Sequence, residues 1–104
     1  MRRDSSVSAT RKADRYVTED VIERHLLREV KKLRGITFKM LFRRGWPDRL
    51  VLLPGRWMFI ELKRPKGGRF EPLQLRTHAR LRAQGYEVHV CYTKEQVDVV
   101  LSYL

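Results

Sequence analysis

Apolar residues recur every three or four positions in the first regularly patterned stretch of the chain. Aliphatic side chains from Ile22 to Leu33 follow this helical spacing. Thr18 precedes them and is a good helix N-cap, and the acidic residues just after it suit the positive end of the helix dipole. Gly35 supplies a stop signal at the other end. We therefore predict a helix that begins near Thr18 and is ended by Gly35.

Three short apolar runs follow the predicted helix. Residues 36–42, 49–53 and 57–63 have the length and the content of β-branched and aromatic residues that strands favour. Pro54 and Gly55 separate the last two runs and are typical turn residues. The pattern predicts three strands, of which the last two form a hairpin.

The hairpin turn sets which residues of these two strands face each other. If the loop consists of two residues, Leu53 faces Arg56, and counting back places Asp48 opposite Glu61. Opposed residues of an antiparallel pair point to the same face, with Cβ atoms about 5 Å apart. A loop of three residues would shift this register by one position.

The rest of the chain predicts a helix, a strand and a final helix. Pro72 opens the second helix at its favoured first position, and Gly85 closes it. Alternation over residues 87–92 indicates a strand, and residues 93–96 fit the capping box of a last helix that runs to about Tyr103. The predicted fold is an α/β domain with the order α-β-β-β-α-β-α.

The chain is strongly basic. Its 104 residues include 23 Lys and Arg against 12 Asp and Glu, which gives a formal net charge of +11. An excess of this size favours a nucleic acid or another polyanion as the partner. The length fits one domain, and we assign this domain to residues 16–104, with residues 1–15 as a basic flexible arm.

Membrane insertion and disulfide bonding are not expected. No apolar stretch approaches the ~18 residues of a membrane span, and the N-terminus lacks the apolar core of a signal peptide. Cys91 is the single cysteine, which excludes a disulfide framework and a cysteine-based zinc site. We expect a cytoplasmic protein.

Asp48, Glu61 and Lys63 are the candidate chemical groups. Glu61 and Lys63 share one strand face because side chains alternate with a period of two, and the hairpin register adds Asp48. Two carboxylates can hold Mg²⁺ or Mn²⁺, which prefer oxygen ligands and promote phosphodiester hydrolysis. The backbone carbonyl of Leu62 and the carboxylate of Glu19, directly or through water, are further candidate ligands. Each motif alone is more often a turn or a solvated face, so the prediction depends on their occurring together.

Four segments carry a family resemblance. In order along the chain they are residues 18–23 (TEDVIE), 44–49 (RGWPDR), 59–63 (FIELK) and 72–74 (PLQ). Together they resemble the VRR-NUC domain, a branch of the PD-(D/E)xK nuclease superfamily, over about residues 17–104. The resemblance implies a restriction-endonuclease-like core, in which helices flank a mixed central β-sheet.

The resemblance also implies which residues are catalytic. Gln74 matches the glutamine that opens the helix after the active-site hairpin and lies near the metal and the scissile phosphate. For the first acid, Glu23 is an alternative to Glu19 because it lies one turn further along the same predicted helix. The residues in the family's catalytic places are Glu19, Asp48, Glu61, Lys63 and Gln74.

The assembly and the substrate follow from the same resemblance. Stand-alone members of the family are typically viral or phage-like, and they resemble archaeal Holliday-junction resolvases in forming two-fold dimers. If this chain is phage-encoded, its compartment is the host cytoplasm. We therefore expect a homodimer that binds DNA, with branched DNA such as a four-way junction as the preferred substrate.

Basic and aromatic residues around the predicted hairpin are candidate DNA contacts. Trp46 could stack on a base or wedge into DNA, or it could pack under the loop before Asp48. His25, His78 and His89 lack the spacing of metal ligands, and we assign them surface or helix-packing roles. The candidate contacts are Arg44, Trp46, Arg49, Arg64, Lys66 and Arg69.

The whole pattern predicts a metal-dependent, structure-selective DNA endonuclease. Lys63 would hold the attacking water or stabilise the developing negative charge. A non-catalytic nucleic-acid-binding module would explain the charge, but it would leave the order of Asp48, Glu61 and Lys63 to chance. A restriction-like nuclease would need an element that reads bases, and none is evident in the sequence.

Overall fold

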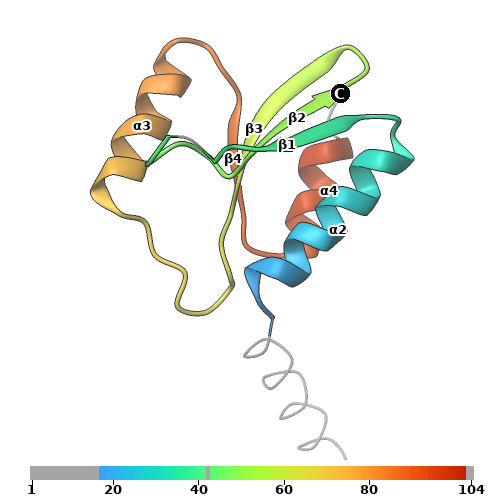
Figure 1. Ribbon diagram of the computed structural model, residues 1–104, viewed down its shortest axis with the longest axis horizontal. Coiled ribbons are helices and arrows are strands. Elements are labelled where there is room, and N and C mark those ends of the chain that lie inside the picture. The colour runs from blue at the N-terminus through green and yellow to red at the C-terminus, as the bar shows by residue number, and fades with distance from the viewer. Residues whose placement is uncertain (1–16, 42, 103–104) are drawn as a thin grey trace, which may run out of the picture.

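The computed structural model describes residues 17–41 and 43–102, so the predicted basic arm and Tyr103 lie outside the described residues (Figure 1). The order of elements confirms the prediction. The helices are α2 (Glu19–Lys32), α3 (Pro72–Ala83) and α4 (Lys94–Ser102), and the strands are β1 (Ile36–Lys39), β2 (Arg49–Leu53), β3 (Arg56–Leu62) and β4 (Val88–Cys91).

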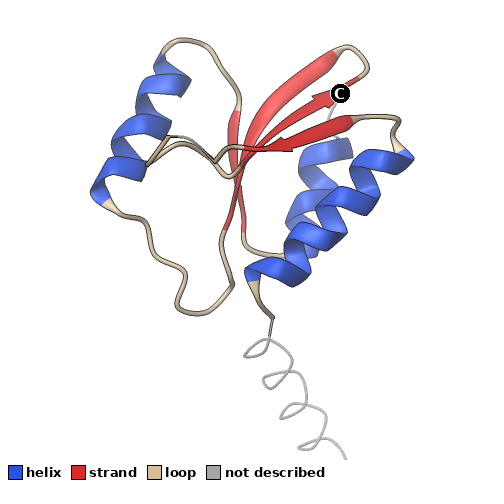
Figure 2. Cartoon of the chain, viewed as in Figure 1, coloured by secondary structure: helices blue, strands red, loops and turns tan. Residues whose placement is uncertain are grey.

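The four strands form one mixed sheet with the spatial order β1-β2-β3-β4. Strands β1, β2 and β3 are antiparallel neighbours, and β4 runs parallel to β3. Helices α2 and α4 lie side by side over one face of the sheet, and α3 lies on the other side (Figures 1 and 2). The fold is therefore the predicted α/β domain with helices flanking a mixed central sheet.

Strand β3 divides its side chains between the two faces of the sheet. Met58, Ile60 and Leu62 are buried in a core with apolar residues of α2 and α4. Phe59 belongs to a second, smaller cluster that includes residues of α3 and β4. Because strand side chains alternate, Glu61 shares the face of Phe59. The main apolar core and the candidate chemical groups thus lie on opposite faces of one strand.

Helix α2 begins where the sequence predicts. Thr18 has an extended backbone, and its Oγ1 accepts a hydrogen bond from the N–H of Val21 at 3.3 Å. This bond satisfies one of the N–H groups that have no partner within the first turn of a helix. The predicted apolar stripe faces the sheet, because Ile22, Leu26 and Val30 are buried.

The end of α2 differs from the prediction, because a residue other than Gly35 turns the chain. Arg34, not Gly35, takes the left-handed conformation, with φ of 62°. The N–H groups of Arg34 and Gly35 donate to the carbonyls of Lys31 and Val30, which is the Schellman pattern. Gly35 is needed for a different reason, since a Cβ there would lie 2.7 Å from the Leu52 carbonyl oxygen.

The hairpin of β2 and β3 has the predicted register. A two-residue turn joins the strands, and Arg49 pairs with Ile60 at the far end of the ladder. The next position outward brings Asp48 opposite Glu61, as the two-residue loop predicts. The alternative register with a three-residue loop is therefore wrong.

Strand β1 is shorter than predicted. It ends at Lys39 rather than at residue 42, because Lys39 already pairs with Arg49, the first residue of β2. One further hydrogen bond runs from the Met40 N–H to the Asp48 carbonyl at 2.7 Å. Beyond this bond β2 offers no further partner, so the chain continues as the loop that carries Trp46.

The last helix begins with a variant of the predicted capping box. The Gln96 N–H donates to Thr93 Oγ1 at 3.1 Å, as predicted. The Gln96 side-chain oxygen, however, accepts from the N–H of Tyr92 at 2.6 Å rather than from that of Thr93. Pro72 and Gly85 bound α3 as predicted. No helix in the described part of the chain has the length and apolar character needed to cross a membrane.

Candidate active site

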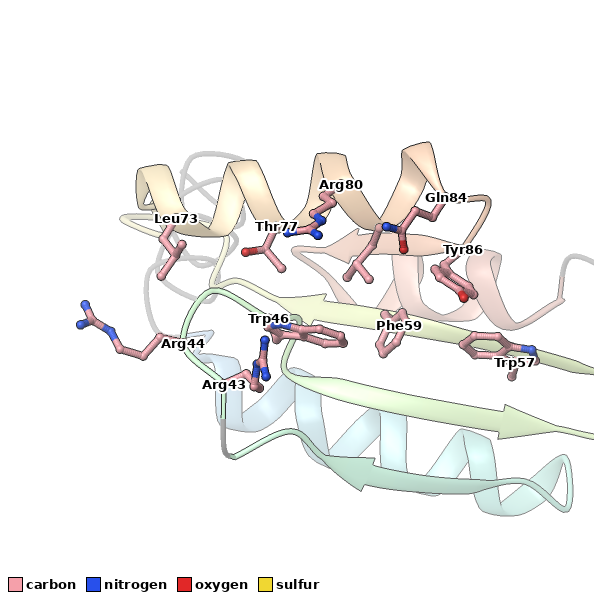
Figure 3. Close-up of a pocket in the computed structure, with 11 residues that line it drawn as sticks. Arg43, Arg44, Trp46, Trp57, Phe59, Leu73, Thr77, Arg80, Gln84 and Tyr86 are labelled. Carbon is pink, nitrogen blue, oxygen red and sulfur yellow. The ribbon is translucent and has the colours of Figure 1, made fainter.

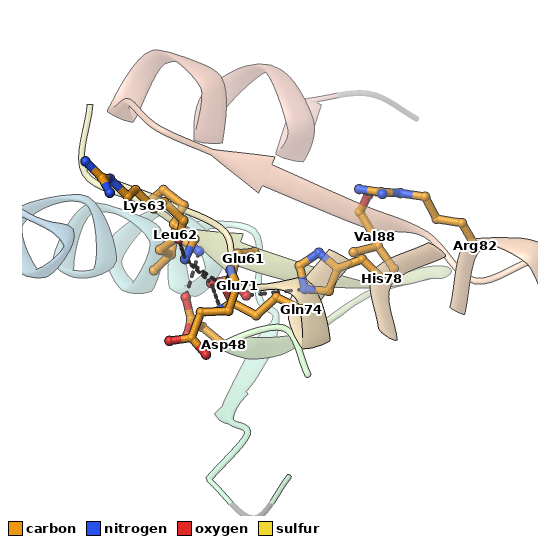
Figure 4. Close-up of polar contacts among 10 residues, drawn as sticks. Asp48, Glu61, Leu62, Lys63, Glu71, Gln74, His78, Arg82 and Val88 are labelled. Carbon is orange, nitrogen blue, oxygen red and sulfur yellow. Dashed lines mark hydrogen bonds and ion pairs between the residues drawn. The ribbon is translucent and has the colours of Figure 1, made fainter. Parts of the chain in front are cut away.

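Asp48 is held at the open end of the hairpin by a hydrogen bond across the two strands. Its Oδ2 accepts from the backbone N–H of Leu62 at 2.8 Å (Figure 4). Pro47, directly before it, is fully buried and fixes the path of the chain into β2. Glu61 comes from the neighbouring strand. The structure therefore brings together the two carboxylates that the sequence pairs.

The surroundings of Asp48 disfavour its charged form. Burial raises the pKa of Asp48 to about 6, and the negative charges of Glu61 and Glu19 add to this rise. The hydrogen bond from the Leu62 N–H acts in the opposite direction. Glu61 is only 2% exposed. A carboxylate pair in such a place favours a proton or a cation beside it.

Lys63 is buried next to this pair, with a side chain only 10% exposed. Its Nζ donates to the carbonyl oxygen of Arg69 at 2.6 Å and to Gln74 Oε1 at 3.2 Å. Nζ also lies 3.6 Å from Glu61 Oε2 and 4.8 Å from the centre of the Phe70 ring. These contacts fix a positive charge beside the carboxylates.

Gln74 connects the lysine to the glutamate. Its Oε1 accepts from Lys63 and also from the N–H of Glu71 at 3.0 Å, at the start of α3. Because both donors engage the amide oxygen, the amide nitrogen points to Glu61 and donates to its Oε2 at 3.3 Å. Gln74 thus acts as a positioning residue for two groups of the site.

Gln74→Ala should lower activity without unfolding the protein. If Glu61 is the metal ligand that the sequence predicts, we expect a loss of about 10- to 100-fold, as is typical when a residue that orients such a ligand is removed. Gln74→Glu should not recover activity, because it keeps an acceptor for Lys63 but places a second carboxylate against Glu61. Steady-state cleavage rates and thermal melts test this, with Leu75→Ala, an exposed neighbour on α3, as the control. Wild-type rates for Gln74→Ala would contradict the positioning role.

His78 belongs to this site, and the sequence interpretation missed it. It lies one helical turn after Gln74 on α3 and is only 1% exposed. Its Nε2 is 3.5 Å from Glu61 Oε1, and its ring packs edge-on against Phe70. The assigned helix-packing role is therefore incomplete. The spacing of four residues from Gln74 was the signal that could have placed both side chains on one helix face.

The donor set fits a hard metal cation. Glu61 Oε1 is buried without a hydrogen-bond partner, beside a second carboxylate with a raised pKa. Within the described residues, no group of three or more His, Cys, Asp and Glu side chains converges on one point. A metal here would thus be held by two carboxylates, with backbone carbonyl and water oxygens completing the shell, as Mg²⁺ sites commonly are.

The two candidates for the first acid have different surroundings. Glu23 Oε2 accepts from Arg49 Nε at 3.0 Å and lies 3.8 Å from Lys39 Nζ. Glu23 is therefore engaged in an ion pair between α2 and the sheet. Glu19 lies in the first turn of α2, exposed, and near enough to raise the pKa of Asp48. The geometry favours Glu19 over Glu23.

Arg49 does not fit the expected DNA contact. It is only 9% exposed, and its guanidinium pairs with Glu23 under α2. Trp46 is half-buried and packs edge-on against Phe59, so part of its surface contributes to the fold. The remaining candidates are exposed on the loops around the site; they are Arg44, Arg64, Lys66 and Arg69.

Comparison with known proteins finds similar sequences and structures. A phage protein named "Putative nuclease p44", from Acyrthosiphon pisum secondary endosymbiont phage 1, is 52% identical over an alignment of 89 residues that covers 83% of this chain and 95% of that protein. A solved structure described as a VRR_NUC domain matches with a TM-score of 0.72 and 32% identity, over 82% of this chain and 95% of the other. No protein-family model matches the chain.

The sheet, the hairpin and the carboxylate-lysine cluster define a small α/β domain of the nuclease class. The sequence identity to both relatives, each covered over 95% of its length, identifies the family within that class. The chain belongs to the VRR-NUC family of nuclease domains. The family resemblance inferred from the sequence motifs is thereby confirmed.

Proposed function

We propose that this chain is a Mg²⁺- or Mn²⁺-dependent endonuclease that cuts branched DNA. One observation carries the proposal: Glu61 Oε1 is buried beside Asp48 without a hydrogen bond, with His78 Nε2 3.5 Å away, while Oε2 faces Lys63. A buried acceptor without a hydrogen bond costs free energy of folding unless a cation or a proton binds it. The phage relative is named as a nuclease, and we extend that activity to this chain.

Asp48 and Glu61 would hold the metal, with the Leu62 carbonyl as a third ligand and Glu19, which does not converge with them among the described residues, acting through water. A bound divalent metal supplies charge at the phosphoryl oxygens and lowers the pKa of a bound water. Lys63 is held in place beside Glu61, where its ammonium can orient the attacking water or stabilise charge on the phosphate. Gln74 keeps Lys63 and Glu61 at a fixed separation.

Recognition of DNA shape fits the exposed basic loops. The net charge of +11 favours a polyanion, and Arg64, Lys66 and Arg69 are exposed on the loop that follows the catalytic lysine. Contacts from such side chains to phosphates position a duplex but carry no sequence information. Selectivity would therefore come from the arrangement of the DNA strands rather than from the order of the bases.

Cleavage of defined DNA structures tests the proposal. Pure protein is incubated with labelled four-way, flap and linear DNA, with Mg²⁺, with Mn²⁺ or with EDTA. We expect cleavage of the branched substrates that depends on the metal. Binding without any cleavage would support a non-catalytic module instead. Cleavage of one linear sequence in preference to the branched substrates would support a restriction-like nuclease.

We propose a homodimer as the working unit. A two-fold dimer presents two sites in matching orientation to the two symmetric strands of a four-way junction. Ile36 and Leu52 pair across β1 and β2, and both are exposed, as is Phe38 on the same face. These side chains are candidates for the interface, because exposed apolar neighbours favour burial against a partner.

Light scattering at micromolar concentration should report about twice the chain mass. Phe38→Asp should lower this mass, because it would place a charge in the candidate interface. Val99→Asp, at an exposed position of α4, is the control and should leave the mass unchanged. A wild-type protein that stays monomeric on junction DNA and yet cuts both strands together would contradict the dimer.

A further inference from the structure

An aromatic pocket of about 670 Å³ opens between the hairpin and α3 (Figure 3). Phe59 and Trp57 line it, and they precede Glu61 by two and four residues on the same face of β3. At a strand rise of ~3.3 Å per residue, they lie about 7 and 13 Å from Glu61 along the strand. Trp46, two residues before Asp48, lines the end nearest to the site.

The rings form a continuous series along one wall. Phe59 packs edge-on between Trp46 and Trp57, with ring centres 5.7 Å apart in both pairs. The ring centre of Trp57 lies 5.4 Å from that of Tyr86, which extends the series. Trp57 is 44% exposed and Tyr86 40% exposed. Much of this aromatic surface therefore faces the pocket and the solvent instead of being sealed in the core.

Positive charge surrounds the same pocket. Arg80, on α3, lines the wall opposite the rings, and Arg44 lines the end near the site. Arg43 also lines the pocket and lies 5.6 Å from the centre of the Trp46 ring. None of the described residues that line it is acidic. A ligand with a flat aromatic ring and a negatively charged group complements such a surface.

We propose that this pocket binds an unpaired base of the DNA substrate, next to the phosphate that is cut. The volume lies within the ~300–1,000 Å³ typical of pockets for small ligands, so it can hold a single base. Stacking on aromatic side chains tolerates every base because each base has a π-face. The arginines would pair with the phosphates on either side of that base.

This pocket would explain a preference for branched DNA. A base within an intact duplex is stacked and paired, so it enters a protein pocket only if it is first extruded. A base at a flap or at a junction centre can enter without that cost. The inference rests on the proposed function, because it assigns part of the substrate to the same site.

Measuring binding in EDTA tests the pocket independently of the proposed nuclease activity, because binding needs no cleavage. The probe is flap DNA with 2-aminopurine at an unpaired position beside the branch point, since stacking on an aromatic ring quenches its fluorescence. Wild-type protein should quench the probe. Trp57→Ala should lose the quenching and bind the flap about 5- to 150-fold more weakly, the effect expected for one lost stacked base. Trp57→Phe should retain both, and binding to intact duplex should be unchanged in all three proteins.

Arginine variants give a matched comparison on one helix. Arg80→Gln should weaken flap binding, whereas Arg76→Gln, exposed on α3 but outside the pocket, should weaken it less. Thermal melts confirm that each variant is folded. Trp57 is partly exposed, so its replacement should be tolerated.

Three results would overturn the pocket assignment. These are wild-type flap binding by Trp57→Ala, wild-type protein that leaves the probe unquenched, and a Trp57→Ala protein with half the wild-type mass by light scattering. Because Trp57 pairs with Leu52 of the candidate dimer interface, the last would show that Trp57 contacts a second copy of the chain instead of DNA. Quenching without cleavage in Mg²⁺ or Mn²⁺ would instead disprove the proposed nuclease activity and leave the pocket standing.

Discussion

Asp48→Asn should abolish cleavage and leave the protein folded. The loss should be well over 100-fold, since even a residue that only supports a metal ligand contributes roughly 10- to 100-fold. Asparagine keeps an oxygen that can accept from the Leu62 N–H, the bond that Asp48 makes at 2.8 Å. Only the negative charge is removed. Glu61→Gln should lose activity for the same reason.

The same substitution should change stability in a way that depends on pH. Because the pKa of Asp48 is raised to about 6 in the folded protein, the folded state binds this proton more tightly than the unfolded state. The contribution of Asp48 to the stability of the wild-type protein is therefore highest at low pH, and it falls as the pH rises from about 4 to about 6. Without metal, Asp48→Asn should melt higher than wild type at pH 8, and the difference should close towards pH 4.

Mn²⁺ should reverse this order at pH 8. A ligand that binds only the folded state raises the melting temperature, and the variant lacks one of the two carboxylates that would bind it. Asp20→Asn, an exposed acid in the first turn of α2, is the control and should cleave, melt and respond to Mn²⁺ like wild type. An Asp48→Asn protein that cleaves junctions at the wild-type rate in Mn²⁺ would show that the site is misassigned.

Local signals made most of the fold predictable from the sequence. The Thr18 cap and the two-residue turn act through neighbours in the chain, so their effects can be read without knowing the rest of the structure. The turn also fixes the register, and this placed Asp48 opposite Glu61. The end of β1 at Lys39 could not be predicted from neighbouring residues, because it depends on where β2 stops offering hydrogen-bond partners.

Contacts between distant elements were not predictable. The burial of Arg49 depends on Glu23, 26 residues earlier on α2, and nothing near Arg49 in the chain signals that partner. The place of His78 beside Glu61 depends on how α3 docks on the sheet. The aromatic pocket likewise joins the loop of Trp46, strand β3 and helix α3, which come together only in the folded chain.

Lys63→Met should nearly abolish cleavage while metal binding persists. Methionine keeps an unbranched apolar chain against Phe70 but removes the ammonium beside Glu61. Loss of one group that stabilises charge in a transition state typically costs about 100- to 1,000-fold. Since the ammonium repels a cation, its removal should leave Mn²⁺ affinity unchanged or higher. Calorimetry with Mn²⁺ and single-turnover cleavage of junction DNA measure the two effects independently.

Lys63→Arg should not restore activity, even though it restores the charge. The ammonium lies in a buried space between the Arg69 carbonyl, the Gln74 amide and Glu61, at 2.6, 3.2 and 3.6 Å. A planar guanidinium is larger and places its N–H groups in a fixed fork, so it cannot reproduce these contacts. Lys31→Met removes the same charge from an exposed position at the end of α2, and it should cleave like wild type. A folded Lys63→Met protein that no longer binds Mn²⁺ would mean that Lys63 supports the metal site instead of the reaction.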